Sequence, residues 1–225
     1  MGNRQRKTIM KNLQQLNEAY AHLSAGERIA RLYQDFDKVL YTSSFGTTSA
    51  ILLDLVKNEN PNQVVHFIDT TYHFRETLAY KNKLTELLNL NIEVLRAEKW
   101  KNNISWNEEL WQKDADLCCS INKVEPVENI KGDYQVWISG LMHWQSNSRR
   151  EREIFEEKNG IIRFHPLIDW SEAEANLYYE MNNLPLHPLT RLGYQSVGCF
   201  YCTRQGKKRE GRWNNTLKTE CGLHV

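Results

Sequence analysis

The sequence of 225 residues lacks the long apolar runs that signal peptides and membrane-spanning helices need. Residues 1–20 instead mix polar side chains with the cations Arg4, Arg6 and Lys7. This absence argues against secretion and membrane insertion. We therefore expect a cytoplasmic protein.

An excess of one charge sign is also lacking, because 29 Lys and Arg residues face 28 Asp and Glu residues, for a formal net charge of +1. A nearly neutral protein has no general electrostatic attraction for long nucleic acids or anionic membranes. We expect neither as a partner, and any site for an anion must be local.

Internal repeats, low-complexity blocks and linkers rich in Pro, Gly or Ser are absent as well. We therefore predict a single domain over residues 1–225, which is long enough for one sizeable core. Within it we distinguish a helical N-terminal segment over about 1–37 and an α/β core over about 38–183. In the tail, over about 184–225, periodicity fades and Gly, Arg, Lys and Cys dominate.

Apolar runs rich in β-forming residues alternate with helical patterns along the core. The pair Ser24 and Glu27 has the capping-box spacing that begins a helix, here through about residue 35. Ser171 and Glu174 have the same spacing for a helix that ends near residue 182. The alternation predicts an α/β fold with a mostly parallel, twisted sheet flanked by helices on both faces. The expected strands are 38–42, 64–68, 92–96, 135–139 and 161–164.

Ligands bind such sheets beyond the carboxyl ends of the strands, where the strand order reverses. The loop after the first expected strand, residues 42–49, has small hydroxyl side chains around Gly46 and precedes an apolar helix over 50–56. It is a candidate cradle for phosphate or sulfate at a helix N-terminus; an ordinary Ser-rich turn is the alternative. It is not a Walker loop, because the Gly-Lys-Ser/Thr ending is missing. Asp69, after the second expected strand, could accept hydrogen bonds from ribose hydroxyls.

Five cysteines in a reducing compartment favour metal binding or catalysis over a disulfide framework. Cys118 and Cys119 are adjacent, and Cys199 and Cys202 form a C-x-x-C pair about 80 positions further along. Four thiolates in two local pairs suit a zinc ion or an iron-sulfur cluster. Adjacent cysteines are awkward on one zinc ion, whereas a 4Fe-4S cubane offers each thiolate its own iron, so the chemistry favours the cluster. Burial of Cys118 and Cys119 as small apolar residues is the alternative.

The fifth cysteine, Cys221, lies in the stretch Lys-Thr-Glu-Cys-Gly-Leu-His-Val over residues 218–225. A terminal segment suits a nucleophile that must meet a substrate and then present an adduct to a second protein. Residues 203–219 carry six cations against Glu210 alone, and nearby cations stabilise the reactive thiolate. Such a run is either a solvated basic tail or a lid that binds sulfate and phosphate. Its place between a C-x-x-C pair and a further cysteine favours the lid, since arginine forks bind oxyanions bidentately.

Four stretches closely resemble the assimilatory adenylyl-sulfate and phosphoadenylyl-sulfate reductases, and the resemblance runs from about Val39 to the C-terminus. The Glu-Cys-Gly-Leu-His ending is highly specific for this family. The paired cysteines are the mark of its branch with a 4Fe-4S cluster, whose members usually act on adenosine 5'-phosphosulfate (APS) rather than on its 3'-phosphorylated form (PAPS). The stretches are Lys-Thr-Glu-Cys-Gly-Leu-His (218–224), Cys-Cys with Lys-Val-Glu-Pro (118–126), Gly-Cys-Phe-Tyr-Cys-Thr-Arg (198–204) and Arg-Glu-Gly-Arg-Trp (209–213).

The resemblance implies an adenine nucleotide alpha hydrolase-like fold, in which residues 38–183 bind the nucleotide and residues 184–225 supply cluster ligands and the nucleophile. It implies that Cys221 attacks APS, forms an S-sulfocysteine and releases AMP, after which thioredoxin or glutaredoxin frees sulfite. PAPS as sole or second substrate stays open, as does a homo-oligomer. The implied substrate-binding residues are Ser43, Ser44, Phe45, Gly46, Thr47, Ser49, Asp69, Lys123, Arg149, Arg209 and Arg212. The implied cluster ligands are Cys118, Cys119, Cys199 and Cys202.

Three motifs depart from the family pattern. A basic pair often precedes Gln-Ser, whereas His143 and Trp144 stand there in this chain. Thr71 replaces the glycine of the usual Asp-Thr-Gly, and Asn122 replaces the basic residue that usually precedes Lys123. These departures affect substrate affinity and the choice between the two nucleotides, and they leave the nucleophile and the cluster ligands intact.

Two other functions account for part of the pattern. An adenylating ATP pyrophosphatase, such as a sulfur-inserting tRNA enzyme, needs a Gly-Gly and an Asp in the first loop, which residues 43–49 lack. A non-catalytic iron-sulfur or zinc module with a nucleic-acid-binding tail predicts salt-sensitive RNA or DNA binding and gives Cys221 no role.

Overall fold

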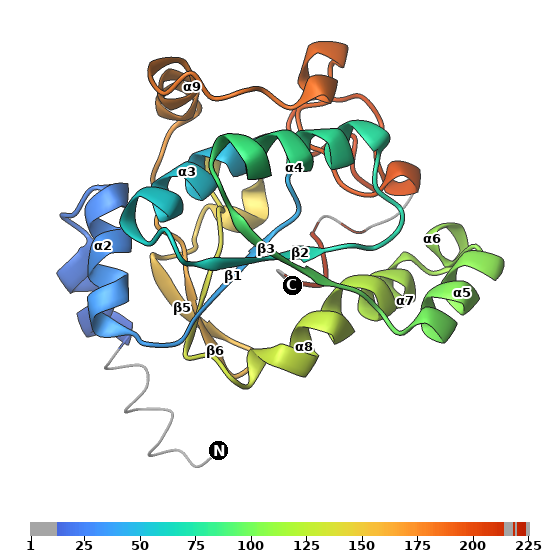
Figure 1. The fold of residues 1–225 in the computed structure, drawn as a ribbon, viewed down its shortest axis with the longest axis horizontal. Helices are drawn as coiled ribbons and strands as arrows, with labels where there is room; N and C mark the ends of the chain where they lie inside the picture. The colour runs from blue at the N-terminus through green and yellow to red at the C-terminus, as the bar shows by residue number, and fades with distance from the viewer. Residues whose placement is uncertain (1–12, 214–217, 219, 224–225) are drawn as a thin grey trace.

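The structure is a computed structural model that describes residues 13–213, 218 and 220–223. The first twelve residues of the expected N-terminal segment lie outside the described residues, as do Thr219 and His224 of the terminal motif. A six-stranded sheet runs through the centre of the molecule (Figure 1). Its strands are β1 (Val39–Ser43), β2 (Val64–Ile68), β3 (Asn91–Leu95), β4 (Val136–Ile138), β5 (Phe155–Lys158) and β6 (Ile161–Phe164).

The sheet has the order β3-β2-β1-β4-β6-β5. Neighbouring strands are parallel except β5, which runs antiparallel to β6. The predicted α/β fold with a mostly parallel sheet is confirmed. The five predicted strands match within one residue at each end.

Helices cover both faces of the sheet, because side chains of successive strand residues point to opposite sides. In β1, Val39 and Tyr41 join the larger core beneath α2 and α3, whereas Leu40 packs with Val127 of α8 on the other face. Helices α5 to α7 lie together beside the sheet (Figure 1). The bounds are α2 (Ala25–Asp35), α3 (Ser49–Glu59), α4 (Arg75–Leu87), α5 (Lys99–Asn107), α6 (Leu110–Lys113), α7 (Ala115–Cys119), α8 (Glu125–Lys131) and α9 (Glu172–Met181), with a π-helical turn η1 (Ser120–Val124) and 3-10 turns η2 (His143–Gln145), η3 (Asn147–Arg149), η4 (Pro188–Leu192) and η5 (Phe200–Cys202).

Both predicted capping boxes are present. The Ser24 amide donates to the Glu27 carboxylate at 2.8 Å while Ser24 Oγ accepts from the Glu27 amide, and α2 ends at Asp35 as predicted. Ser171 and Glu174 make the same reciprocal pair at the start of α9, which ends at Met181. Each box satisfies N–H groups that a helix start leaves without partners.

The strand β5 was not predicted. It contains three charged residues in four, so it lacks an apolar alternation, and it lies at the edge of the sheet where water can solvate them. Asn159 and Gly160, with φ of 53° and 77°, form the turn that joins it to β6. An Asn-Gly pair is a strong hairpin signal, so this turn could have predicted a strand before it that pairs with β6.

The order of the strands reverses at β1, which pairs with β2 on one side and β4 on the other. The loops that follow β1 and β4 therefore diverge and leave a crevice at the carboxyl ends of the strands. Residues of the tail dock at this end of the sheet, where Thr47 Oγ1 donates to the Gln195 carbonyl at 2.9 Å and His73 forms an antiparallel bridge with Cys199. Among the described residues, no helix is both long and apolar enough to cross a bilayer.

Candidate active site

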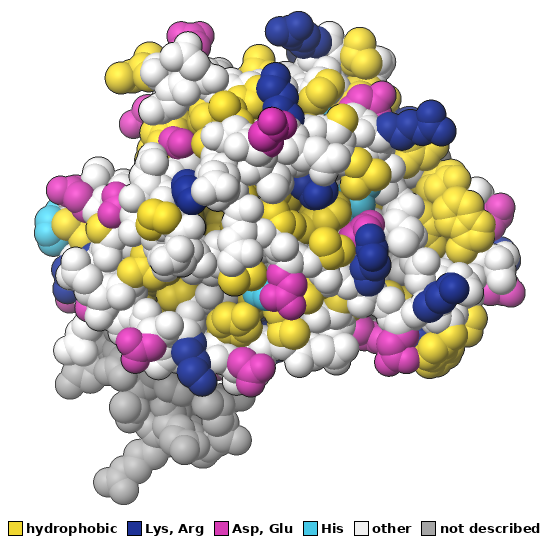
Figure 2. Space-filling model, viewed as in Figure 1, with side chains coloured by type: hydrophobic (Ala, Val, Ile, Leu, Met, Phe, Trp, Pro, Cys, Tyr) yellow, Lys and Arg dark blue, Asp and Glu magenta, His cyan; other side chains and the backbone are white. Residues whose placement is uncertain are grey.

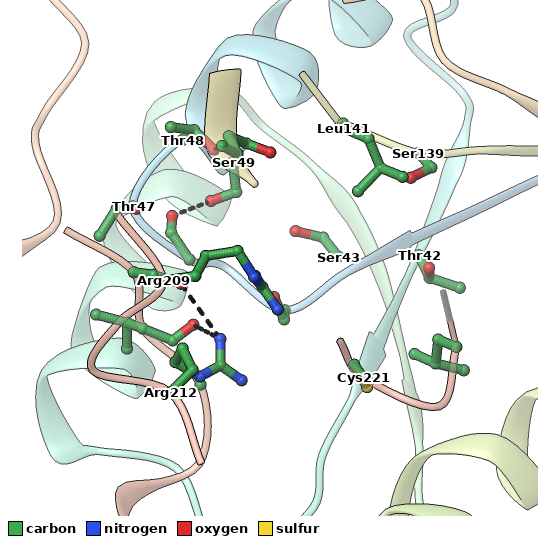
Figure 3. A pocket seen from close by; sticks show the side chains of 18 of the residues that line it. Thr42, Ser43, Thr47, Thr48, Ser49, Ser139, Leu141, Arg209, Arg212 and Cys221 are labelled. Carbon is green, nitrogen blue, oxygen red and sulfur yellow. Dashed lines mark hydrogen bonds between the residues drawn. The ribbon is translucent and has the colours of Figure 1, made fainter. Parts of the chain in front are cut away.

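A cavity of about 220 Å³ lies at the carboxyl ends of the strands. The loops after β1, β2 and β4 line it, which is the position predicted from a mostly parallel sheet, and the C-terminal tail also contributes to its wall. The β1 loop contributes Ser43, Ser44, Gly46, Thr47, Thr48 and Ser49. In Figure 3 the hydroxyl-bearing side chains of this loop lie on one side of the cavity, with Ser43 near its centre.

Phe45 explains how the β1 loop is held. Its backbone adopts a left-handed φ of 50°, and its fully buried ring packs against Phe67 with centroids 5.6 Å apart. The Ser49 amide and Oγ both donate to the Gly46 carbonyl, at 3.1 and 2.7 Å, as α3 begins. The predicted Phe45 thus belongs to the core and anchors the loop, while its neighbours face the cavity.

Asp69 lies beside the cavity but does not line it. Its carboxylate accepts a fork from Arg96 at 2.7 and 2.9 Å and a hydrogen bond from the Thr71 amide at 2.9 Å. Burial alone would raise the pKa of Asp69, but the Thr71 and Arg96 hydrogen bonds lower it overall. Thr71 itself has a φ of 65°, a conformation that favours glycine, so the usual Asp-Thr-Gly pattern fits this turn.

Positive charge is concentrated on the cavity wall. Arg209 and Arg212 enter it from one side, and Cys221 lies on the other (Figure 3). Among the described residues no Asp or Glu side chain lines the cavity, so its wall presents cations and no carboxylate to an anionic ligand. The cations in the wall are Lys123, Arg149, Lys208, Arg209 and Arg212.

Arg212 is held by contacts with the chain segment before the C-x-x-C pair and with Trp213. Its Nη1 donates to Ser196 Oγ and to the Val197 carbonyl, both at 3.3 Å, and its guanidinium stacks on Trp213 at 4.4 Å from the ring centre. A Cβ at Gly198 would collide with the same guanidinium, so this glycine makes room for it. Burial, together with repulsion from Arg149 and Arg212, lowers the pKa of Arg209 to about 9, which still leaves a cation at neutral pH.

Glu220, the residue before Cys221, was not predicted as a site residue. Its carboxylate, like the Arg149 side chain, is about 6% exposed. Arg149 binds it as a fork, with Nε to Oε1 and Nη2 to Oε2 both at 2.9 Å. Arg209 adds an ion pair at 3.0 Å, and the hydroxyls of Ser146 and Ser148 donate at 3.0 and 3.1 Å. The structure therefore brings Arg149 to the cavity wall, as predicted, but directs its fork at the tail.

The four cysteines of the two predicted pairs line one second, small cavity. Cys118 and Cys119 end α7, Cys199 precedes the turn η5, and Cys202 is the last residue of that turn. The Phe200 amide donates to the Tyr72 carbonyl at 2.6 Å, which fixes η5 against the loop after β2. Positions about 80 apart in sequence are thereby brought together as predicted.

Several polar groups contact these sulfurs. Lys123 Nζ lies 3.7 Å from Cys119 Sγ, and Asn122 Nδ2 lies 3.8 Å from Cys118 Sγ. Both pairs have the i, i+4 spacing that places side chains on one helix face, here across the π-helical turn η1. Asn122, which departs from the basic residue of the family pattern, is buried and also donates to Ser105 Oγ at 2.8 Å.

Aromatic side chains enclose the cysteines on the outer side. Tyr72 stacks on Trp106 and Tyr201 stacks on Trp111, with ring centres 5.5 and 4.3 Å apart. The resulting apolar surface lies over α5 and α6, at the right of Figure 2. Burial raises the pKa of the Cys118 thiol, and it raises that of Cys202 to about 11.

Cys221 lies in the wall of the large cavity, next to the four-cysteine cavity. A hydrogen bond from the Cys119 thiol, with the charges of Lys123 and Arg212, lowers the pKa of Cys221 well below its ordinary value although burial opposes this. The thiolate is the nucleophilic form, so this position favours a reactive sulfur. The structure brings the predicted nucleophile, the β1 loop and the basic residues around one space.

Comparisons with known proteins agree with this geometry. A profile described as "Phosphoadenosine phosphosulfate reductase domain" matches residues 38–205. An adenosine 5'-phosphosulfate reductase of Halalkalibacterium halodurans is 34% identical, over 97% of this chain and 99% of that protein. A phosphoadenosine 5'-phosphosulfate reductase of Vibrio parahaemolyticus is 38% identical, over 94% and 86%. The crystal structure of a phosphoadenylyl-sulfate reductase from Candida auris, a phosphate complex, has a TM-score of 0.75 at 25% identity and covers 86% of this chain and 97% of that one.

Proposed function

The chain belongs to the phosphoadenosine phosphosulfate reductase domain family, and from this membership we propose that it reduces APS to sulfite and AMP in sulfate assimilation, with Cys221 as the nucleophile. One observation carries the assignment of the nucleophile. The Cys221 thiol lies in the wall of the same cavity as the β1 loop and five cations.

Different residues of the cavity wall bind different parts of the substrate. The hydroxyls and glycine of residues 43–49 receive the nucleotide at the start of α3, where backbone N–H groups face an anion. Lys123, Arg209 and Arg212 neutralise the phosphate and sulfate oxygens. Neutralisation matters because an anionic thiolate must approach an anionic sulfur, and it becomes more effective where water is excluded.

The reaction proceeds as two displacements on sulfur. The Cys221 thiolate attacks the sulfur of APS, the bond from that sulfur to the bridging phosphate oxygen breaks, and the electron pair leaves with AMP. A thiolate of thioredoxin or glutaredoxin then attacks Cys221 Sγ, and sulfite leaves as the mixed disulfide forms. The second thiol of that partner resolves the disulfide, so the two electrons come from its dithiol.

Cys118, Cys119, Cys199 and Cys202 would hold a 4Fe-4S cluster. Four thiols line one cavity, while among the described residues no three His, Cys, Asp or Glu side chains are arranged to hold a single metal ion. A zinc ion needs its sulfurs within about 2.3 Å of one point, whereas a cubane spreads them over four irons. When bound, such a cluster supplies a negatively charged centre and does not need to change its oxidation state.

Lys123 links the two parts of the site. It contacts Cys119 Sγ at 3.7 Å and also lines the substrate cavity. Burial would lower the pKa of Lys123, but the nearby sulfurs of Cys199, Cys221 and Cys119 raise it overall, so the side chain stays a cation. Because a ligating thiolate has no proton to donate, Lys123 and Arg212 then stabilise the Cys221 thiolate.

The nucleophile is tested with Cys221→Ser in anaerobically purified protein. The variant should bind APS but form no S-sulfo adduct on the peptide 218–223 by mass spectrometry, and it should release no sulfite with thioredoxin. Wild-type protein assayed beside it with APS and with PAPS gives the substrate preference, which we expect to favour APS. Sulfite release by the variant at the wild-type rate would refute the role of Cys221.

A further inference from the structure

Glu220 occupies a binding site that is built for an anion. Two guanidinium groups and two hydroxyls converge on its carboxylate, at distances from 2.9 to 3.1 Å. A carboxylate has about four lone-pair positions, so these donors use its accepting capacity. The arrangement joins the residue before the nucleophile to the segment after β4.

We infer that Glu220 is a positioning residue that latches the tail onto Arg149, and so places Cys221 at the substrate cavity. This inference rests on the proposed role of Cys221 and adds to it a cause for the thiol's position. Arg149 then acts mainly through the tail, and its fork is engaged before substrate arrives.

Burial makes the loss of either partner of this contact costly. Both side chains are about 6% exposed, and removal of one partner would leave the other charge buried. The tail also makes an ion pair between Lys218 and Asp116, but this carboxylate is 84% exposed, and ion pairs open to water contribute little. Glu220 is therefore the stronger of these two anchors.

The latch also leaves the site suited to substrate. Lys123, Lys208 and Arg212 also line the cavity, where their charges can meet an incoming anion. The missing basic pair before Gln145 fits the same picture, because Trp144 lines the cavity there and Ser146 binds the tail. The segment after β4 serves to hold the tail as well as to bind nucleotide.

The test measures access to Cys221 without substrate, in anaerobically purified holoenzyme. A small reagent, iodoacetamide, and a bulky one, a polyethylene glycol maleimide, are compared, and mass spectrometry assigns the modified cysteine. A change in thiolate fraction alters both rates alike, whereas release of the tail raises the ratio of bulky to small modification. The variants are Glu220→Gln, Arg149→Gln and the double variant. Glu210→Gln is the control, because Glu210 is an exposed carboxylate in the same basic segment.

We expect Glu220→Gln to raise the ratio about tenfold, as loss of a charge-assisted hydrogen-bond pair allows. Arg149→Gln should raise it similarly, the double variant no further, and Glu210→Gln not at all. In Glu220→Gln the single-turnover rate of sulfo-adduct formation should fall. The factor of this fall should be larger than the factor by which the steady-state KM for APS rises. An unchanged ratio in Glu220→Gln, or additive effects in the double variant, would overturn the latch.

Further measurements distinguish the latch from displacement of Glu220 by a ligand and from loss of the fold. AMP added to wild-type protein should leave the ratio unchanged or lower it; a rise would mean that the ligand's anion displaces Glu220, and the latch would be wrong. Because the access measurement needs no turnover, it holds even if Cys221→Ser shows the proposed nucleophile to be wrong. Thermal unfolding of each variant shows whether its fold is intact.

Discussion

Replacing Gly198 by alanine should displace the Arg212 guanidinium and abolish its function, although residue 212 itself is unchanged. An added Cβ would lie 2.5 Å from Arg212 Cζ and still nearer to its Nη2, closer than Cβ atoms come to other atoms in folded proteins. Gly198 does not need a left-handed backbone, so alanine keeps the local chain conformation. The flexible guanidinium must move instead, and it loses its contacts with Ser196 and Val197.

The magnitude follows from the contact that we propose between Arg212 and the substrate. A hydrogen bond to a charged group contributes about 1.5–3 kcal/mol. Since about 1.4 kcal/mol corresponds to a factor of ten, kcat/KM for APS should fall by about 10- to 100-fold. The unfolding temperature should change little, because the displaced side chain lies at the cavity wall.

The assay is sulfite release at saturating thioredoxin over a range of APS concentrations. Gly132→Ala is the matched control, because no atom lies within 4 Å of its added Cβ. The double variant Gly198→Ala with Arg212→Ala should be no worse than Arg212→Ala alone, since both changes remove the same group. A Gly198→Ala enzyme within about threefold of wild type, or multiplicative effects in the double variant, would refute the reasoning.

Two other predictions concern the metal and the fold. Cys202→Ser should contain far less iron and acid-labile sulfide per chain than Cys221→Ser, because Cys202 lines the four-cysteine cavity and Cys221 does not. Equal contents in the two variants would remove Cys202 from the ligand set. Burial lowers the pKa of His187 from 6.5 to about 4, and its Nδ1 accepts from the Leu189 amide while its Nε2 faces Thr77 Oγ1. The unfolded chain therefore binds a proton that the folded chain does not, so the free energy of unfolding should fall by roughly 3 kcal/mol as pH drops from about 6.5 to about 4. His187→Gln should flatten that part of the profile in urea denaturation, and an unchanged slope would contradict the assignment.

The sequence predicts the fold well where local signals and burial agree. The strands β2 and β6 are apolar runs bounded by turn residues, and their predicted bounds match those in the structure. The edge strand β5 has no such run, because three of its four residues are charged and two, Glu156 and Glu157, are adjacent. Its identity depends on pairing with β6, which the Asn-Gly turn indicates but the residues of β5 themselves do not.

The candidate site shows the same division. The cysteine spacing predicts a common centre, and the fold brings all four side chains to one cavity. The roles of Glu220 and Asp69 depend on which arginines reach them, and that is set by the tertiary structure. Glu220 nonetheless left a signal in the sequence: an acid within a strongly basic tail needs a cationic partner if it is buried.

The position of the two cysteine pairs constrains how the molecule is assembled. Cys118 and Cys119 precede β4 and β6, whereas Cys199 and Cys202 follow them, so the pairs meet only across a long closed loop of chain. Because Cys199 and Cys202 follow every strand of the sheet in the chain, the pairs can meet only after the residues of the whole sheet have been synthesised. A nascent or truncated chain that ends before the second pair would contain every strand of the sheet yet only half of the proposed ligands. Insertion of iron and sulfide would accordingly be a maturation step that follows folding of the sheet rather than one that nucleates it.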